Sequence, residues 1–288
     1  DGLPVIFTYN ATSHVLRIQV EGAPRGDIAL RRAHWVSGEL LVWNPSVEIP
    51  TGATVALHYD PSGAMTLGPG GISGGQSITL TRETVGLPGY LQTKFPHLVG
   101  KPVFRIADAD LIKVKDILKG QVALSLRNAD GNSLDATGVQ LPGVLDALYA
   151  NDAALGVTWN GAVPTFRLWA PTARNVTLRL YNDSTTTFFS SQPLSLDAAT
   201  GVWSATGASS LKGKYYLYEV EVYVPALKAV VKNLVTDPYS LSLSLNSTRS
   251  QLVDLTDAAL APTGWSTLVK PALAAPEDIV LYELHVRD

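Results

Sequence analysis

The sequence predicts a mainly β protein with two β-sandwich domains, the second of them immunoglobulin-like. Short runs of apolar and β-branched residues recur between Gly, Pro, Asn and Asp, a pattern typical of sandwiches. Segments with the periodicity of a long helix are nearly absent. The chain has 288 residues, 46% of them hydrophobic, which is enough for two buried cores.

The first domain is expected over residues 1–150. Most of its expected strands alternate apolar with polar residues, so each covers one face of a core. These strands are residues 5–9, 15–20, 28–35, 40–43, 54–59, 77–80, 103–106 and 122–127. Short helical segments are expected at residues 87–95, 110–118 and 144–149, the second with an acidic N-cap and a glycine stop.

The second domain is expected over residues 151–262 and opens with a hairpin signature. Residues 155–159 and 163–169 flank Asn160-Gly161, a dipeptide that supplies the positive φ angles of a type I′ turn. Further strands are expected at residues 176–181, 186–189, 202–205, 215–223 and 228–233. This strand density matches an immunoglobulin-like sandwich. A Pro- and Ala-rich connector follows, and residues 263–288 form a linker with a last strand at 279–286.

Charge and cysteine content narrow the possible partners. Lys and Arg total 22 and Asp and Glu 25, a net charge of −3 without long like-charge runs, so neither nucleic acid nor a membrane is an expected partner. The absence of cysteine excludes disulfides, thiolate metal sites and a cysteine nucleophile. It fits a reducing compartment and an exported protein equally well.

Sequence motifs of nucleotide, metal and serine chemistry are missing. No glycine loop has the Lys and spacing needed for phosphate, and the five histidines are scattered without a metal-ligand spacing. On the last strand Glu283 and His285 share a face, as a catalytic pair would. A structural ion pair is the favoured interpretation, because one strand cannot assemble an active site. The expectation is therefore no catalytic residue, no metal site and no cofactor in this chain.

Aromatic residues are the remaining candidates for a binding site. Sugar rings present flat C–H faces that stack on Trp and Tyr while polar side chains bind the hydroxyls. Trp169 is expected in the core. Trp203 follows a turn, and Tyr215 faces opposite to Tyr216 and Tyr218 on one strand, so Trp203 and Tyr215 are the candidate carbohydrate-binding residues.

Six segments, in order along nearly the whole chain, form a recognisable set. They are Arg32-Ala-His-Trp-Val-Ser37, Lys94-Phe-Pro-His-Leu98, Asp135-Ala-Thr-Gly-Val-Gln-Leu-Pro-Gly-Val-Leu-Asp146, Phe166-Arg-Leu-Trp-Ala-Pro-Thr-Ala173, Val235-Thr-Asp-Pro-Tyr239 and Tyr282-Glu-Leu-His-Val-Arg-Asp288. This set resembles pullulanase-type debranching enzymes, including limit dextrinases, of the α-amylase superfamily (glycoside hydrolase family 13). The resemblance implies an N-terminal β domain, a carbohydrate-binding-module sandwich and then a (β/α)8 barrel, of which residues 279–286 would be the first strand in a truncated chain.

The resemblance also implies a function. Such enzymes hydrolyse α-1,6-glucosidic branch points in pullulan, amylopectin or limit dextrins by a retaining mechanism, with an Asp nucleophile and a Glu acid/base on later barrel strands. This chain would be the non-catalytic N-terminal portion, inactive alone, in a soluble plastidial or extracellular protein. Calcium, if present, would belong to the missing barrel.

Glucan binding by this portion is expected to be weak. Glycogen-binding relatives of the second domain grip the glucan with two tryptophans and a lysine, and here the matching places hold Asn182-Asp-Ser, Leu217 and Pro225-Ala-Leu. Two alternatives stay open. One is a stand-alone α-glucan-binding protein without hydrolase activity, and the other is an exported structural or adhesive protein.

Overall fold

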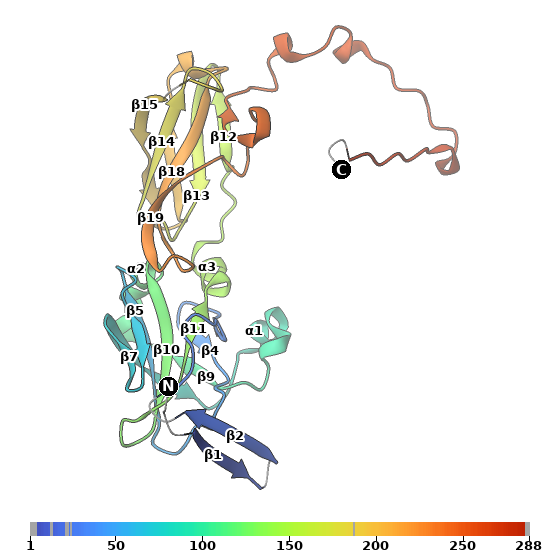
Figure 1. Cartoon of the computed structure of the whole chain (residues 1–288). Helices are drawn as coiled ribbons and strands as arrows, with labels where there is room; N and C mark the ends of the chain where they lie inside the picture. The colour runs from blue at the N-terminus through green and yellow to red at the C-terminus, as the bar shows by residue number, and fades with distance from the viewer. Residues whose placement is uncertain (1–4, 12–13, 21–22, 24, 187, 286–288) are drawn as a thin grey trace. The chain divides into compact units, whose positions relative to one another are not determined.

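The computed structural model describes residues 5–11, 14–20, 23, 25–186 and 188–285. Contacts between Cα atoms divide the chain into two compact units, Asp1–Leu252 and Val253–Asp288. The structure is mainly β, as predicted, and both expected β domains lie in the first unit (Figure 1).

The first domain is a closed barrel of seven strands and not the expected sandwich. Its order is β10-β11-β3-β4-β9-β8-β5, with β5 pairing back to β10. The strands are β3 (Ala33–Trp35), β4 (Leu40–Val42), β5 (Thr54–Asp60), β8 (Gln76–Glu83), β9 (Val103–Arg105), β10 (Gln121–Arg127) and β11 (Ser133–Gln140). The barrel closes because β11 pairs parallel with β3, a long-range contact that strand periodicity does not reveal.

Bulky aromatic and aliphatic side chains fill the barrel. Trp35 and Trp43 are fully buried, and Phe104 packs with them in the same cluster. Alternation in the middle of β5 and β8 contributes to this core, since Val55 and Leu57 of β5 and Ile78 and Leu80 of β8 are buried.

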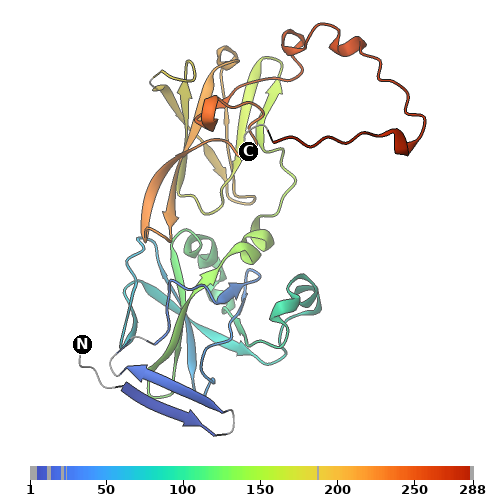
Figure 2. The ribbon, with the colours of Figure 1, turned by 45° about the vertical axis from the view of Figure 1, so that its right-hand side comes forward.

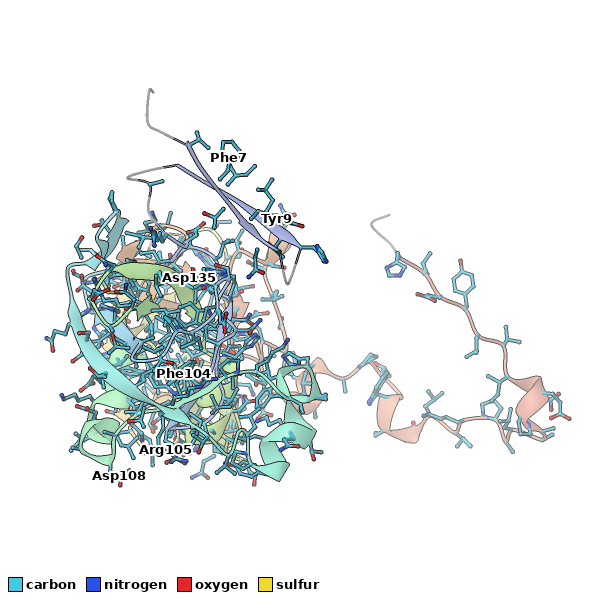
Figure 3. The ribbon with its side chains drawn as sticks, turned by 90° about the horizontal axis from the view of Figure 1, so that it is seen from below. Phe7, Tyr9, Phe104, Arg105, Asp108 and Asp135 are labelled. Carbon is cyan, nitrogen blue, oxygen red and sulfur yellow. The ribbon has the colours of Figure 1, made fainter. Side chains whose placement is uncertain are left out.

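Short helices and hairpins surround the barrel. The helices are α1 (Gly89–Lys94), α2 (Val114–Ile117) and α3 (Pro142–Tyr149), and the hairpins are β1–β2 (Val5–Asn10, Val15–Val20) and β6–β7 (Thr66–Gly68, Gly71–Ser73). The helix expected over residues 110–118 is a 3₁₀ segment, Asp108–Lys113, followed by the single turn α2. Figure 3 labels Asp135 and Phe104 of the barrel and the exposed Phe7 and Tyr9 of the β1–β2 hairpin.

The second domain has two antiparallel sheets, as the sequence predicts (Figure 2). One sheet has the order β12-β13-β17-β16, and the other has the order β15-β14-β18-β19 with β20 pairing to β18. Its strands are β12 (Gly156–Asn160), β13 (Val163–Trp169), β14 (Asn175–Tyr181), β15 (Phe188–Pro193), β16 (Ser195–Asp197), β17 (Val202–Thr206), β18 (Tyr215–Val224), β19 (Ala229–Val235) and β20 (Ser250–Gln251). Phe166, Leu178, Tyr216 and Tyr218 form the buried centre between the sheets.

The turn between β12 and β13 differs from the expected type I′ turn. Asn160 pairs with Val163 in the ladder, so the two-residue loop is Gly161-Ala162. Gly161 has φ +56° and Ala162 is not among the positive-φ residues, which is the φ pattern of a type II′ turn. Asn160 therefore ends a strand and does not form the turn.

Hydrogen bonds link the barrel and the sandwich within the first unit. The Arg174 guanidinium donates to the carbonyl oxygens of Pro61 and Lys119, and Lys115 Nζ donates to the Ala198 carbonyl oxygen over 2.6 Å. Trp169 Nε1 donates to the Tyr149 carbonyl oxygen at 3.2 Å, which ties β13 to the end of α3.

The second unit contains only 3₁₀ turns among its described residues 253–285. The turns are Ala258–Leu260, Trp265–Thr267 and Pro276–Asp278. Residues 279–285 form no strand, unlike the expected strand 279–286, whose last residue lies outside the described residues. A strand exists only when a neighbour accepts and donates its backbone hydrogen bonds, and none of the described strands pairs with this segment.

Candidate carbohydrate-binding face

The outer face of the five-stranded sheet carries a row of aromatic rings. Alternation along β14 places Leu178 and Leu180 in the core and turns Tyr181 outward. In the ladder Tyr181 lies opposite Tyr215 of β18 on one side and Phe188 of β15 on the other. The register thus brings three rings from three strands into one line across the sheet.

Cationic side chains pack on these rings. The Arg249 guanidinium carbon lies 3.8 Å from the centroid of Tyr181, and Arg249 also donates to the Asp183 carbonyl oxygen. The Arg179 guanidinium carbon lies 4.8 Å from the centroid of Phe188. Guanidinium groups stack well on aromatic faces, so both rings are held in place.

The rings differ in how much surface they offer to a ligand. Tyr181 is 7% exposed because Arg249 covers it, whereas Phe188 and Phe189 are 44% and 40% exposed. Lys214 Nζ lies 5.7 Å from the centroid of Phe189. Lys214 also donates to Asn182 Oδ1 at 2.9 Å. Exposed rings beside an ammonium and an amide form a surface that can stack on a sugar ring and bind its hydroxyls.

The two residues singled out from the sequence lie in different environments. Tyr215 is half-buried on the outer face, next to Tyr181. Trp203 is 6% exposed and belongs to the sandwich core, where its Nε1 donates to the Ala170 carbonyl oxygen at 3.0 Å. A buried ring offers no open face for stacking, so the burial argues against Trp203 as a stacking residue, and its role in binding stays a prediction.

Sequence reasoning missed Phe188 and Phe189 as members of this face. Both lie within the expected strand 186–189, but a strand pattern in the sequence does not show which residues of neighbouring strands lie opposite Tyr181. The cations come from Arg179, Lys214 and Arg249, which are far apart in the chain and meet only through the sheet register.

The two most buried carboxylates among the described residues make structural contacts. Asp135 is fully buried and its carboxylate pairs with the Arg32 guanidinium at 2.8 Å. Asp237 is 3% exposed and accepts hydrogen bonds from the Tyr216 and Tyr218 hydroxyls. Burial, with the nearby negative charge of Asp237, raises the pKa of both tyrosines, so both hydroxyls stay protonated and donate.

Glu283 and His285 form an exposed contact outside any strand. Their side chains lie 3.3 Å apart with exposed fractions of 90% and 72%. Both side chains are therefore open to solvent, and the absence of a catalytic residue in this chain stays a prediction.

Among the described residues, no group of three or more His, Cys, Asp or Glu side chains could hold a metal ion. Among the described residues, no helix is long and apolar enough to cross a membrane.

Comparisons with known proteins agree with the architecture. Residues 30–147 match the Pullulanase N2 domain and residues 154–240 match carbohydrate-binding module 48, the isoamylase N-terminal domain. The chain is 36% identical over 264 residues to Pullulanase 1, chloroplastic, of Arabidopsis thaliana, covering 89% of this chain and 26% of the relative. It is also 36% identical over 269 residues to pullulanase of Klebsiella pneumoniae, covering 91% and 24%.

Solved structures give the same result. The Klebsiella pneumoniae pullulanase complexed with maltotriose superposes with a TM-score of 0.76 at 37% identity, covering 85% of this chain and 23% of that one. PulA from Klebsiella oxytoca superposes with a TM-score of 0.76 at 36% identity, covering 84% and 22%. The chain thus spans about a quarter of the length of these relatives. It matches a pullulanase N2 domain followed by a carbohydrate-binding module 48 and is similar, over about nine tenths of its length, to the N-terminal region of pullulanases.

Proposed function

We propose that this chain is the N-terminal support of a debranching enzyme that hydrolyses α-1,6-glucosidic bonds in pullulan, amylopectin or limit dextrins. The observation that carries the proposal is the 36% identity to pullulanases along about nine tenths of the chain. The plant relative is chloroplastic and others are bacterial, so a plastid and the cell exterior are both proposed compartments.

The segment 279–286 has a role in this proposal. Ile279, Val280, Leu281 and Tyr282 are all more than half exposed, which is unfavourable for an apolar run that stays in water. In the parent enzyme this run would form the first strand of the catalytic barrel, with neighbouring strands satisfying its backbone and helices covering its side chains.

A chimera tests the supporting role. The aligned N-terminal region of the Klebsiella pneumoniae pullulanase is replaced by this chain, and hydrolysis of pullulan is followed by reducing-sugar release. We expect this chain alone to release no sugar and the chimera to be active. A folded but inactive chimera would contradict the proposal, provided that restoring the native region restores activity.

A second candidate function is α-glucan binding by the sandwich, with or without a catalytic barrel. The row of Phe188, Tyr181 and Tyr215, with Phe189 beside it, favours it. The places that match the two tryptophans and the lysine of glycogen-binding relatives hold other residues in this chain. We therefore expect weak binding that depends on the exposed phenylalanines and Tyr215.

Isothermal titration with maltoheptaose tests this function. Phe188→Ala and Tyr215→Ala should each weaken binding, because each removes a stacking surface. Tyr90→Ala is a matched control, since Tyr90 is a 67% exposed aromatic residue of the other domain. No heat of binding by the unmodified chain would leave the sandwich with an architectural role only.

A further inference from the structure

A groove of about 570 Å³ lies within the first unit, between the barrel and the β18–β19 hairpin. Its apolar floor includes Ile28, Val122 and Val139, and Tyr223 contributes an aromatic ring. Sites that bind small molecules commonly combine such a volume with an apolar floor and a few polar groups at the rim. Neither the aromatic row around Tyr181 nor any family motif quoted above includes Tyr223.

The charged side chains lining this groove are cations. Arg31 and Lys228 line it, and no Asp or Glu does. Within the described part of the chain, neither Arg31 nor Lys228 forms an ion pair with a carboxylate. Two uncompensated positive charges beside a low-dielectric floor produce a local field that attracts an anion.

Tyr223 lies within the same electrostatic environment. Burial raises the pKa of Tyr223, the positive charge of Arg31 opposes that rise and Asp60 adds to it. Asp60 does not line the groove, and its carboxylate already accepts hydrogen bonds from Ser62 and Ala64. The Tyr223 hydroxyl therefore stays protonated near neutral pH and can donate to an anion.

Hydrogen bonds order the backbone at both cations, whose side chains are exposed. Gln140 Nε2 donates to the Arg31 carbonyl oxygen at 2.8 Å. Lys228 lies in the turn between β18 and β19 with φ +50°, and its amide donates to the Pro225 carbonyl oxygen at 3.3 Å. The backbone of both residues is therefore hydrogen-bonded, and among the described residues neither charged group has an acidic partner.

We propose that this groove binds a phosphate oxyanion, either free phosphate or the phosphate of a sugar monoester. The Arg31 guanidinium presents a fork of donors suited to two phosphate oxygens, Lys228 adds a point charge, and the Tyr223 hydroxyl adds a neutral donor. The apolar floor can receive the ring of a sugar phosphate. This inference stands independently of glucan binding on the aromatic row.

Titrations of the full chain, followed by amide chemical shifts, test the proposal with inorganic phosphate, glucose 6-phosphate and glucose as probes. We expect saturable shifts near Arg31 and Lys228 with the two phosphates and none with glucose. Tighter binding of glucose 6-phosphate identifies a sugar monoester as the ligand, and equal binding identifies free phosphate. No saturable binding of either phosphate at about 10 mM would overturn the proposal, since that limit corresponds to a negligible affinity.

Matched variants locate the site. Arg31→Gln and Lys228→Gln should each weaken phosphate binding about tenfold, because each removes a charge-assisted hydrogen bond. Lys232→Gln, an exposed lysine of the same hairpin that does not line the groove, should leave binding unchanged. Thermal unfolding verifies that all three variants fold. Phosphate binding that persists in the Arg31→Gln, Lys228→Gln double variant would place the anion elsewhere and refute the assignment.

Discussion

Asp135 of the barrel and Asp237 of the sandwich are the two described carboxylates that are at most 3% exposed, and the two domains compensate these charges differently. In the barrel, Asp135 pairs with a guanidinium and accepts further hydrogen bonds from the Ser46 amide, the Ser46 hydroxyl and its neighbour's amide. In the sandwich, Asp237 accepts from two tyrosine hydroxyls and the Tyr239 amide, with no cation among the partners that the structure describes.

The two carboxylates show that the pullulanase-like segments contribute structural hydrogen bonds to each core. Asp135 lies in the segment 135–146 and Asp237 in the segment 235–239, both of which resemble pullulanases. Both carboxylates are buried and hydrogen-bonded to protein groups. Asp135 ties β11 to Arg32 and Ser46, and Asp237 ties the chain after β19 to β18. These two carboxylates of family-like segments are thus the polar anchors of two separate cores.

The largest expected effect comes from Asp135→Asn. The substitution keeps the shape but removes the charge that compensates Arg32 and turns an amide towards the Ser46 donors. Breaking a buried ion pair on one side costs about 3 kcal/mol or more, and the partial exposure of Arg32 favours the lower end. Urea unfolding measures the change in the free energy of unfolding.

Asp130→Asn is the matched control, since Asp130 is exposed in the turn between β10 and β11. Its substitution should change the free energy of unfolding by less than about 0.5 kcal/mol. Equal effects of the two substitutions would show that Asp135 does not anchor the barrel.

The second prediction concerns acid, to which the two domains should respond differently. Residues 151–252 contain no histidine, whereas the barrel contains His58, whose pKa is lowered to about 4 by burial and then by the positive charge of Arg127. The folded barrel therefore holds His58 neutral against an unfolded pKa near 6.5. Between about pH 6.5 and pH 4 the unfolded chain binds a proton at His58 and the folded barrel does not, so the free energy of unfolding falls as the pH is lowered through this range. Above about pH 6.5 His58 is neutral in both states and causes no loss.

Substitution of the histidine isolates this contribution. His58→Gln should remove up to about 2 kcal/mol of the pH-dependent loss, a value reduced from the full pKa shift because the ring is partly exposed. Urea unfolding at several pH values between 7 and 4 measures it. If the pH profiles of the unmodified chain and of His58→Gln run parallel, His58 is not the source of the acid sensitivity.

The third prediction tests the hydroxyl partners of Asp237. The Tyr216 hydroxyl lies 2.8 Å from Asp237 Oδ2, and the Tyr218 hydroxyl lies 3.4 Å from the same atom. Tyr216→Phe should cost about 1 kcal/mol, the usual net value of a buried hydrogen bond, and Tyr218→Phe should cost less. The two variants control for each other, because each loses one hydroxyl beside the same carboxylate. A larger cost for Tyr218→Phe would reverse this ranking of the two bonds.

Sequence periodicity predicted most strands and the core positions along them, but not which strands pair. It therefore gave two sandwiches where the first domain is a barrel, since closure depends on the parallel contact of Val139 and Gln140 with Ala33 and His34. It also missed β11, where Asp135 and Gly138 interrupt the β-type pattern. The aromatic row was only partly predictable for the same reason, because the ring neighbours of Tyr181 are set by register.

The smallest effect is expected for the ion pair on the outer face of the sandwich. Arg179 donates from two nitrogens to one Glu219 carboxylate oxygen, and the side chains are 30% and 17% exposed. Pairs that water still reaches contribute about 0.5 kcal/mol, because solvent screens the attraction and ordering two long side chains costs entropy. A double-mutant cycle with Arg179→Met and Glu219→Gln measures the coupling free energy, and 1 M salt should reduce it further. A coupling as large as the cost of Asp135→Asn would mean that the sandwich also depends on a compensated charge, and the contrast between the two domains would fail.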